Sequence, residues 1–118
     1  MDTEALIPMN PRDYLILFAL TDGERHGYGI VKDVERDSGG QVTIDPANLY
    51  RSIKRMRATG LVEDAGTRAA ADAQDERRRY YRITALGRQV VRLEAGRLAA
   101  LTAAARERDL LPERSGRR

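Results

Sequence analysis

Apolar residues along this chain follow several different spacings, and each spacing predicts a different kind of element. Residues 14–20, YLILFAL, are apolar at nearly every position, which is typical of a helix buried on more than one face. Asn10 is a suitable N-cap and Pro11 a suitable first helical residue. The pattern therefore predicts a helix over residues 10–21.

The next apolar positions are spaced four residues apart. Ile30 and Val34 share one face of a second predicted helix, over residues 27–38, and the SGG sequence that begins at Ser38 is a good terminator. Residues 41–44, QVTI, predict a short extended connector with about one rung of strand pairing.

A third helix is predicted over residues 46–59, because Asp45 is a good N-cap and Gly60 a good terminator. Its apolar side consists of Leu49, Ile53 and Met56. Its polar side consists of Asn48, Arg51, Lys54 and Arg55, with Tyr50 on the border. Residues 46–60 contain no acid, so this helix presents a basic face outward.

Alternating residues then predict a β-hairpin over residues 61–83, with strands at its two ends. Residues 65–76 between them are small and polar, and we expect a flexible loop there. Thr84 is a suitable N-cap for a long last helix over residues 84–110, and residues 111–118 are expected to form a flexible tail.

The first and last helices carry more apolar surface than one small domain buries, which favours a second copy of the chain as partner. The residues expected at this dimer contact are Tyr14, Leu17, Phe18, Val90, Leu93, Leu98 and Leu101.

The order of elements predicts a mainly α fold with a small β-hairpin: a winged helix-turn-helix domain over residues 1–83, followed by the long C-terminal dimerisation helix. In such domains the second helix of the motif enters the major groove of duplex DNA. Arg51 and Arg55 are expected to contact guanine or phosphate, and Asn48 adenine or phosphate. The residues expected at the DNA backbone or minor groove are Tyr50 and Lys54 of the helix and Arg77, Arg78 and Arg79 of the wing.

Composition places few constraints on the fold, but the charge, cysteine and histidine contents argue against several classes of function. The chain has 118 residues, a net charge of +3 and a pI of about 9.6, so the clustering of charge matters more than its sum. It has no cysteine and a single histidine, His26, in a glycine-rich turn, so we expect no enzyme activity, metal or cofactor. Without a long apolar run or a secretory pattern at the N-terminus, we expect no membrane segment and a cytoplasmic location.

Several ordered motifs resemble the PadR family of transcriptional regulators. They are Gly27-Tyr28, Leu49-Tyr50, Gly60-Leu61-Val62, Tyr80-Tyr81-Arg82-Ile83-Thr84 and Gly87-Arg88. The resemblance implies a winged-helix homodimer of the short subtype, in which Tyr50 contacts the DNA backbone. It also implies a repressor of its own or a neighbouring operon, with a small aromatic or drug-like effector. A two-fold dimer predicts a palindromic operator.

Two alternatives remain open at the level of sequence. Residues 75–87, DERRRYYRITALG, also fit the wing of a MarR-type regulator. A winged helix can also serve as a protein-binding adaptor without DNA specificity.

Overall fold

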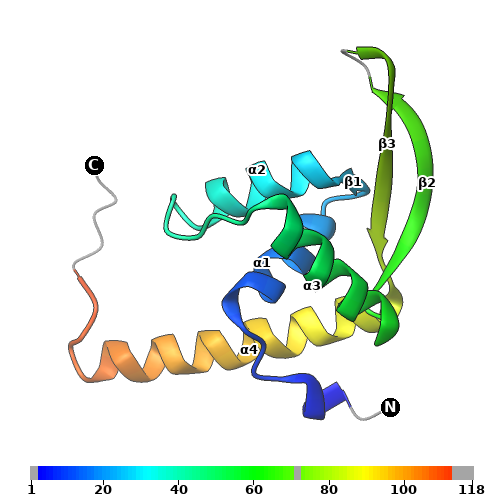
Figure 1. Ribbon diagram of the computed structural model, residues 1–118. Coiled ribbons are helices and arrows are strands. Elements are labelled where there is room, and N and C mark those ends of the chain that lie inside the picture. The colour runs from blue at the N-terminus through cyan, green and yellow to red at the C-terminus, as the bar shows by residue number, and fades with distance from the viewer. Residues whose placement is uncertain (1–2, 71–72, 113–118) are drawn as a thin grey trace.

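The computed structural model describes residues 3–70 and 73–112, in which a body of helices carries a small antiparallel sheet on one side (Figure 1). The elements are a 3-10 helix η1 (Thr3–Leu6), α1 (Pro11–Leu20), β1 (Arg25–His26), α2 (Gly27–Asp37), α3 (Pro46–Ala58), β2 (Val62–Ala70), β3 (Ala73–Ile83) and α4 (Ala85–Glu107).

Local capping explains where three of the helices begin. Asn10, Asp45 and Thr84 are the N-caps of α1, α3 and α4, as the sequence predicts. Each side chain accepts a hydrogen bond from the backbone N–H three residues later, at 2.8 to 3.0 Å. Gly60, with φ of +84°, follows the C-cap of α3 and turns the chain into β2.

The core lies where α1 packs against α2 and α4, with one stripe of α3 and the base of the sheet closing it. Ile16 and Leu17 of α1 are both fully buried, which confirms that this helix is buried on more than one face. The other core side chains are Leu20, Ile30, Val34, Ile44, Leu49, Ile53, Met56, Leu61, Val62, Tyr81, Ile83, Val90 and Val91.

The sheet differs from the sequence expectation in its strand content. Its three strands have the order β1-β3-β2, and β1 is a short strand that residue patterns do not predict. Arg25 and His26 pair with Tyr81 and Tyr80 of β3. Residues 41–44 were expected to add a rung but do not join the sheet, because they bridge α2 and α3 on the other side of the body.

The wing is also more regular than predicted. Residues 65–76 were expected to form a loop, and residues 71 and 72 of that range lie outside the described residues. In the rest, β2 and β3 continue their antiparallel pairing from Val62↔Ile83 to Ala70↔Ala73. The register shifts between Asp64 and Thr67, at Gly66, whose φ is +99°. A glycine in this conformation is typical of a β-bulge, so the bulge absorbs a residue while the ladder goes on.

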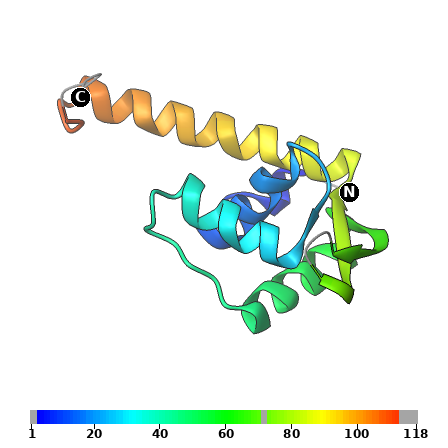
Figure 2. The same cartoon turned by 90° about the horizontal axis from the view of Figure 1, so that it is seen from above.

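Two parts of the molecule extend beyond the helical body. The β2–β3 hairpin rises past α2 and α3 on one side, and the C-terminal turns of α4 run past the other helices (Figures 1 and 2). Within the described residues, no helix is both long and apolar enough to cross a membrane.

Candidate nucleic-acid interface

The outward face of α3 is basic. The helix buries Leu49, Ile53 and Met56, each no more than 2% exposed, and thereby leaves Tyr50, Arg51 and Lys54 on the solvent side. No acid lies on the helix itself. A polyanion that approaches this face therefore meets no charge of its own sign from α3.

The first turns of α3 hold Arg51 in a defined position. Asp45 Oδ2 accepts a hydrogen bond from Asn48 Nδ2 at 3.0 Å, and Asn48 Oδ1 accepts one from Arg51 Nη1 at 2.5 Å. Both ends of the Asn48 amide are thus engaged. This arrangement favours Asn48 as the residue that orients Arg51 and leaves the rest of the guanidinium fork facing solvent.

Arg55 has a different environment from the one that the sequence suggests. It was expected to face outward with Arg51, but its Nη2 forms an ion pair with Asp13 Oδ2 at the start of α1. Arg57, near the C-terminus of α3, is paired with Asp64 of β2 at 2.9 Å. Among the described cations of α3, Arg51 and Lys54 form no ion pair with an acid.

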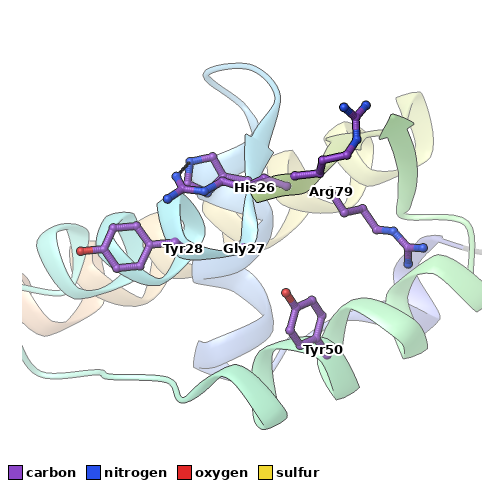
Figure 3. Close-up of a pocket in the computed structure, with 7 residues that line it drawn as sticks. His26, Gly27, Tyr28, Tyr50 and Arg79 are labelled. Atoms are coloured by element: carbon purple, nitrogen blue, oxygen red, sulfur yellow. Dashed lines mark hydrogen bonds between the residues drawn. The ribbon is translucent and has the colours of Figure 1, made fainter. Parts of the chain in front are cut away.

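Gly27 allows α2 to begin very close to α3. A Cβ at this position would lie 3.3 Å from Leu49 Cδ2 and 3.3 Å from the Tyr50 hydroxyl, so a larger residue would require these two side chains to shift by a few tenths of an ångström. Figure 3 shows Tyr50 rising from α3 toward Gly27, with His26 and Tyr28 at the start of α2. The tight approach brings two tyrosines to one side of the molecule.

A cleft of about 370 Å³ opens at this meeting point of α2, α3 and the wing. Its lining residues are His26, Gly27, Tyr28, Tyr50, Arg77, Arg78 and Arg79. The N-terminus of α2 adds its partial positive charge to the three arginines. The cleft thus combines cations and hydroxyl groups, which is the chemistry that binds phosphate.

His26 organises the cleft, and the sequence did not indicate this role. Its Nδ1 accepts the Gly29 N–H at 3.1 Å and caps α2, while its Nε2 lies 3.0 Å from Arg78 Nη1. Its ring also meets the Tyr80 ring edge-on at 5.3 Å between centroids. His26 lies three residues before Gly29, the usual spacing of an N-cap. Histidine is not among the preferred capping residues, so the sequence gives no stronger signal of this cap.

Glu24, on the turn just before β1, balances two of the wing arginines. Glu24, just before β1, is paired with Arg68 of β2 and with Arg82 of β3, the latter at 2.9 Å. These partners, Arg68 first, lower the pKa of Glu24 below its ordinary value. Arg68 and Arg82 therefore lie in ion pairs with Glu24, whereas Arg77, Arg78 and Arg79 line the cleft.

Tyr81 joins the cleft wall to the core. Its side chain is 2% exposed, and burial raises its pKa, with a further contribution from Tyr50 and an opposing hydrogen bond from Arg79. Tyr81 therefore packs as a neutral core residue, as the alternation of its strand predicts. Arg77 is held along the wing, where its Nη2 donates to the Thr67 carbonyl at 3.2 Å.

The residues expected at a dimer contact separate into two groups. Leu17 and Val90 are fully buried within the chain's own core, so they offer no surface to a partner and that expectation needs correction. Tyr14, Leu93 and Leu98 are half-buried, while Phe18 is 42% exposed and Leu101 is 59% exposed. The periodic pattern of the sequence identifies apolar positions, but it does not distinguish those that the monomer buries from those that stay exposed.

The described residues contain no group of three or more acidic or histidine side chains arranged to hold a metal ion. The outward face of α3 and the adjoining cleft thus remain the main chemical feature of the surface.

Comparison with known proteins gives the family. The model of the "Transcriptional regulator PadR-like family" matches residues 16–93. A protein of transposon TN4556 from Streptomyces fradiae is 32% identical over 93 residues, 79% of this chain and 24% of that protein, so the chain spans about a quarter of that relative. A protein from Lysinibacillus sphaericus is 30% identical over 77 residues, 64% of this chain and 67% of that one.

Solved structures share the fold. A PadR-like regulator from Bacillus cereus matches with a TM-score of 0.68 and 16% identity, over 92% of this chain and 96% of that one. A PadR family regulator from Clostridium difficile matches with a TM-score of 0.66 and 20% identity, over 81% and 95%. Bacillus subtilis PadR, in complex with operator DNA, matches with a TM-score of 0.58 and 22% identity, over 68% and 44%.

Proposed function

The chain belongs to the PadR-like family of transcriptional regulators, and on this premise we propose that it binds a palindromic DNA operator as a homodimer and represses transcription. The observation that carries the proposal is the acid-free outward face of α3, with Arg51 held in place beside the basic cleft of the wing. Such a regulator works at the chromosome, so we place it in the cytoplasm.

The two surfaces divide the work of recognition. Arg51, on the exposed middle of α3, presents a guanidinium fork that suits guanine O6 and N7 in the major groove. Lys54 and Tyr50 flank it and suit the phosphates on either side. In the cleft, Arg78 and Arg79 follow the backbone beside the wing. Bacillus subtilis PadR, which shares this fold, was solved in complex with operator DNA, and this supports a DNA partner for the chain.

A two-fold dimer is supported by the apolar surface that α1 and α4 share. Phe18 stacks on Tyr14 with ring centroids 5.8 Å apart, and Tyr14 and Leu98 line one apolar pocket. Leu101 continues this surface one turn farther along α4. The same patch on two copies would bury these side chains and place the two α3 helices in half-sites about 34–36 Å apart, or a multiple.

The apolar pocket also supports regulation by a small molecule. It has a volume of about 270 Å³ and lies between α1 and α4, beside the proposed dimer surface. An aromatic or drug-like effector that fills it would change the spacing of the two α3 helices and so release the operator.

Binding to the DNA upstream of the protein's own gene tests the proposal. The Kd for this duplex is compared with that for a scrambled duplex of equal length across a salt series. We expect a preference for the upstream duplex that persists at about 150 mM salt. Equal and steeply salt-dependent binding to both would reduce the role of α3 to phosphate contact, and no binding to either would favour a protein-binding adaptor.

A further inference from the structure

Arg55 lies on the reading helix α3 and forms an ion pair with a residue of α1. Its Nη2 is bound to Asp13 Oδ2, which belongs to the first turn of α1 and is 42 positions away in the chain. The Arg55 side chain is 53% exposed, whereas the Asp13 side chain is only 11% exposed. The contact therefore joins an exposed cation on the surface to a largely buried carboxylate of α1.

The carboxylate end of this tether is rigid. Asn10 Nδ2 donates to Asp13 Oδ2 at 3.1 Å, and the Asp13 N–H donates to Asn10 Oδ1 at 2.8 Å. Asp13 also lies at the positive end of α1, whose following turns carry the fully buried Ile16 and Leu17. Because α1 is held by the core, Asp13 has no freedom to follow a movement of α3.

The carboxylate also depends on Arg55 for its charge balance. Asp13 Oδ1 is buried and has no hydrogen-bond partner among the described residues. The other oxygen receives Arg55 and one amide group. An ionised carboxylate in such a position is unfavourable unless a cation stays close, so the ion pair resists opening.

The cation end of the tether lies one helical turn beyond Arg51. Residues four apart lie on neighbouring positions of a helix face, so a restraint on Arg55 restrains the rotation of α3 about its axis. Arg51 is in turn fixed to the helix through Asn48. The direction of the Arg51 fork is thus set by the place where Asp13 holds Arg55.

We propose that Asp13 is a positioning residue for sequence recognition: through Arg55 it fixes the rotation of α3 and so aims Arg51 at the base edges. Arg55 then acts as the anchor of the reading helix and not as a base contact. The proposal rests on the function proposed above, in which α3 enters the major groove.

The competing interpretation makes the opposite prediction. In this interpretation Arg55 contacts DNA and the ion pair with Asp13 only keeps it away from the phosphates. Removal of the carboxylate then frees a cation and tightens binding to every sequence. If Asp13 positions α3, its removal weakens binding to the operator while the scrambled duplex gains or keeps affinity. The ratio of the two Kd values therefore separates the interpretations, because added charge alone leaves it unchanged.

The test is Asp13→Asn in the full chain, with the Kd for operator and scrambled duplex measured at several salt concentrations. We expect the specificity ratio to fall about 2- to 30-fold, the range for coupling through a packed network. An unchanged ratio with tighter binding to both duplexes would overturn the proposal.

Asp64→Asn is the matched control. Asp64 also pairs with an arginine of α3, Arg57, but that pair is exposed, with side chains 53% and 38% accessible. The substitution frees a cation on the same helix without touching a buried anchor. We expect the specificity ratio to stay at the wild-type value, and an equal fall in both variants would contradict a specific role for Asp13.

A second measurement needs no DNA. Hydrogen exchange of the α3 amides in the free protein reports whether the helix is held as before, and Asp13→Asn should lower their protection relative to Asp64→Asn. Equal protection of the α3 amides in the two variants would contradict the proposal that Asp13 holds α3 through Arg55, even if the protein binds no operator. Wild-type protein without operator preference would instead count against the proposed function alone.

Arg55→Lys provides a second variant should Asp13→Asn not fold. It keeps the charge but loses the planar guanidinium fork, and we expect it to lower the specificity ratio as well.

Discussion

Arg51 and Lys54 are close neighbours on α3, yet their surroundings assign them different roles. Arg51 is oriented by Asn48, which is itself held by the N-cap Asp45. Lys54 is exposed, and among the described residues no ion pair with an acid fixes its ammonium group. A fixed planar fork suits one base pair, while a free ammonium suits phosphates of any sequence.

Substitution of each by alanine should separate these roles. We expect Arg51→Ala to cost about 1–3 kcal/mol on the operator and to relax the preference at one base position. Lys54→Ala should weaken operator and scrambled duplex equally and reduce the salt slope by about 1. Kd values on a set of single-base operator variants check both. A uniform loss in Arg51→Ala would reassign it to phosphate.

Glu94 is another buried carboxylate with a defined partner. It lies on α4, is 2% exposed, and receives Arg97 Nε and Nη2 at 2.8 and 2.7 Å. Arg97 and, to a lesser degree, the Met9 backbone lower its pKa below the ordinary 4.5, against the opposing effect of burial. The folded state thus favours the ionised form, which stabilises the fold above pH 4.5 and is lost as the pH falls through the lowered pKa.

Replacement of Glu94 by glutamine should remove this contribution. We expect Glu94→Gln to lower the free energy of unfolding at neutral pH by about 1–3 kcal/mol, because Arg97 loses its charged partner. Below pH 4.5 the difference from wild type should shrink. Denaturant unfolding between pH 3 and pH 7 measures both. Glu107→Gln, at an exposed position of α4, serves as control and should stay within about 0.5 kcal/mol. A difference that grows toward acid pH would contradict the assignment.

At the scale of elements, the start of α4 is packed unusually tightly against the base of the wing. A Cβ on Gly87 would lie 2.4 Å from the Leu61 carbonyl oxygen and 2.7 Å from Ile83 Cγ1. One of these neighbours is backbone, which does not move aside cheaply. Gly96, on the same helix, has no atom within 4 Å of the corresponding position.

The same substitution at the two glycines should therefore have opposite effects. We expect Gly87→Ala to lower the free energy of unfolding by about 1–3 kcal/mol through overpacking. Gly96→Ala should raise it by about 0.5–1 kcal/mol, because alanine favours the helix and finds open space. Chemical denaturation of both variants gives the comparison. A stable Gly87→Ala protein would mean that α4 and the wing move apart at low cost.

The wing shows how far local pattern predicts an element. Its buried strand positions, Tyr81 and Ile83, alternate clearly with more exposed ones, and the sequence predicts that strand correctly. Residues 65–70 lack such a pattern, yet they belong to β2 because residues 67–70 pair with β3 beyond the bulge at Ala65 and Gly66. Strand propensity is weaker than the gain from completing backbone hydrogen bonds with a preformed neighbour, so the loop expectation was wrong there.

At the scale of the whole molecule, α4 and the wing extend in different directions from one small core (Figures 1 and 2). The wing carries charge and suits DNA, while α4 carries exposed apolar groups and suits another protein surface. Leu101 is 59% exposed and Phe18 is 42% exposed. Phe18 lies on α1 and Leu101 on α4, and exposed apolar groups of this size are consistent with a contact between two copies.

A charge on this surface should separate the copies without unfolding them. We expect Leu101→Asp to yield monomers with much weaker operator binding, because two half-sites then bind independently. Its exposure implies that the monomer fold is kept. Ala99→Asp introduces the same charge about 200° around the helix and should leave the dimer intact. Analytical ultracentrifugation distinguishes the outcomes, and a dimer unaffected by Leu101→Asp would move the interface elsewhere.

The sequence by itself determined what depends on neighbouring residues. Asn10, Asp45 and Thr84 cap their helices through groups three residues away, and helical spacing alone separates the basic face of α3 from its buried stripe. These interactions have short range in the chain. They therefore act in the same way wherever the rest of the chain goes, and they sufficed to predict the winged-helix order and the reading helix.

Only the tertiary structure decided what depends on distant partners. It placed Arg55, expected to contact guanine or phosphate, in an ion pair with Asp13, and it placed Leu17 and Val90, expected at the dimer surface, in the core. It also paired the short strand at His26 with β3. The partner of a charged side chain and the burial of an apolar side chain both depend on which residues lie nearby in space. Those neighbours are set by how the elements pack.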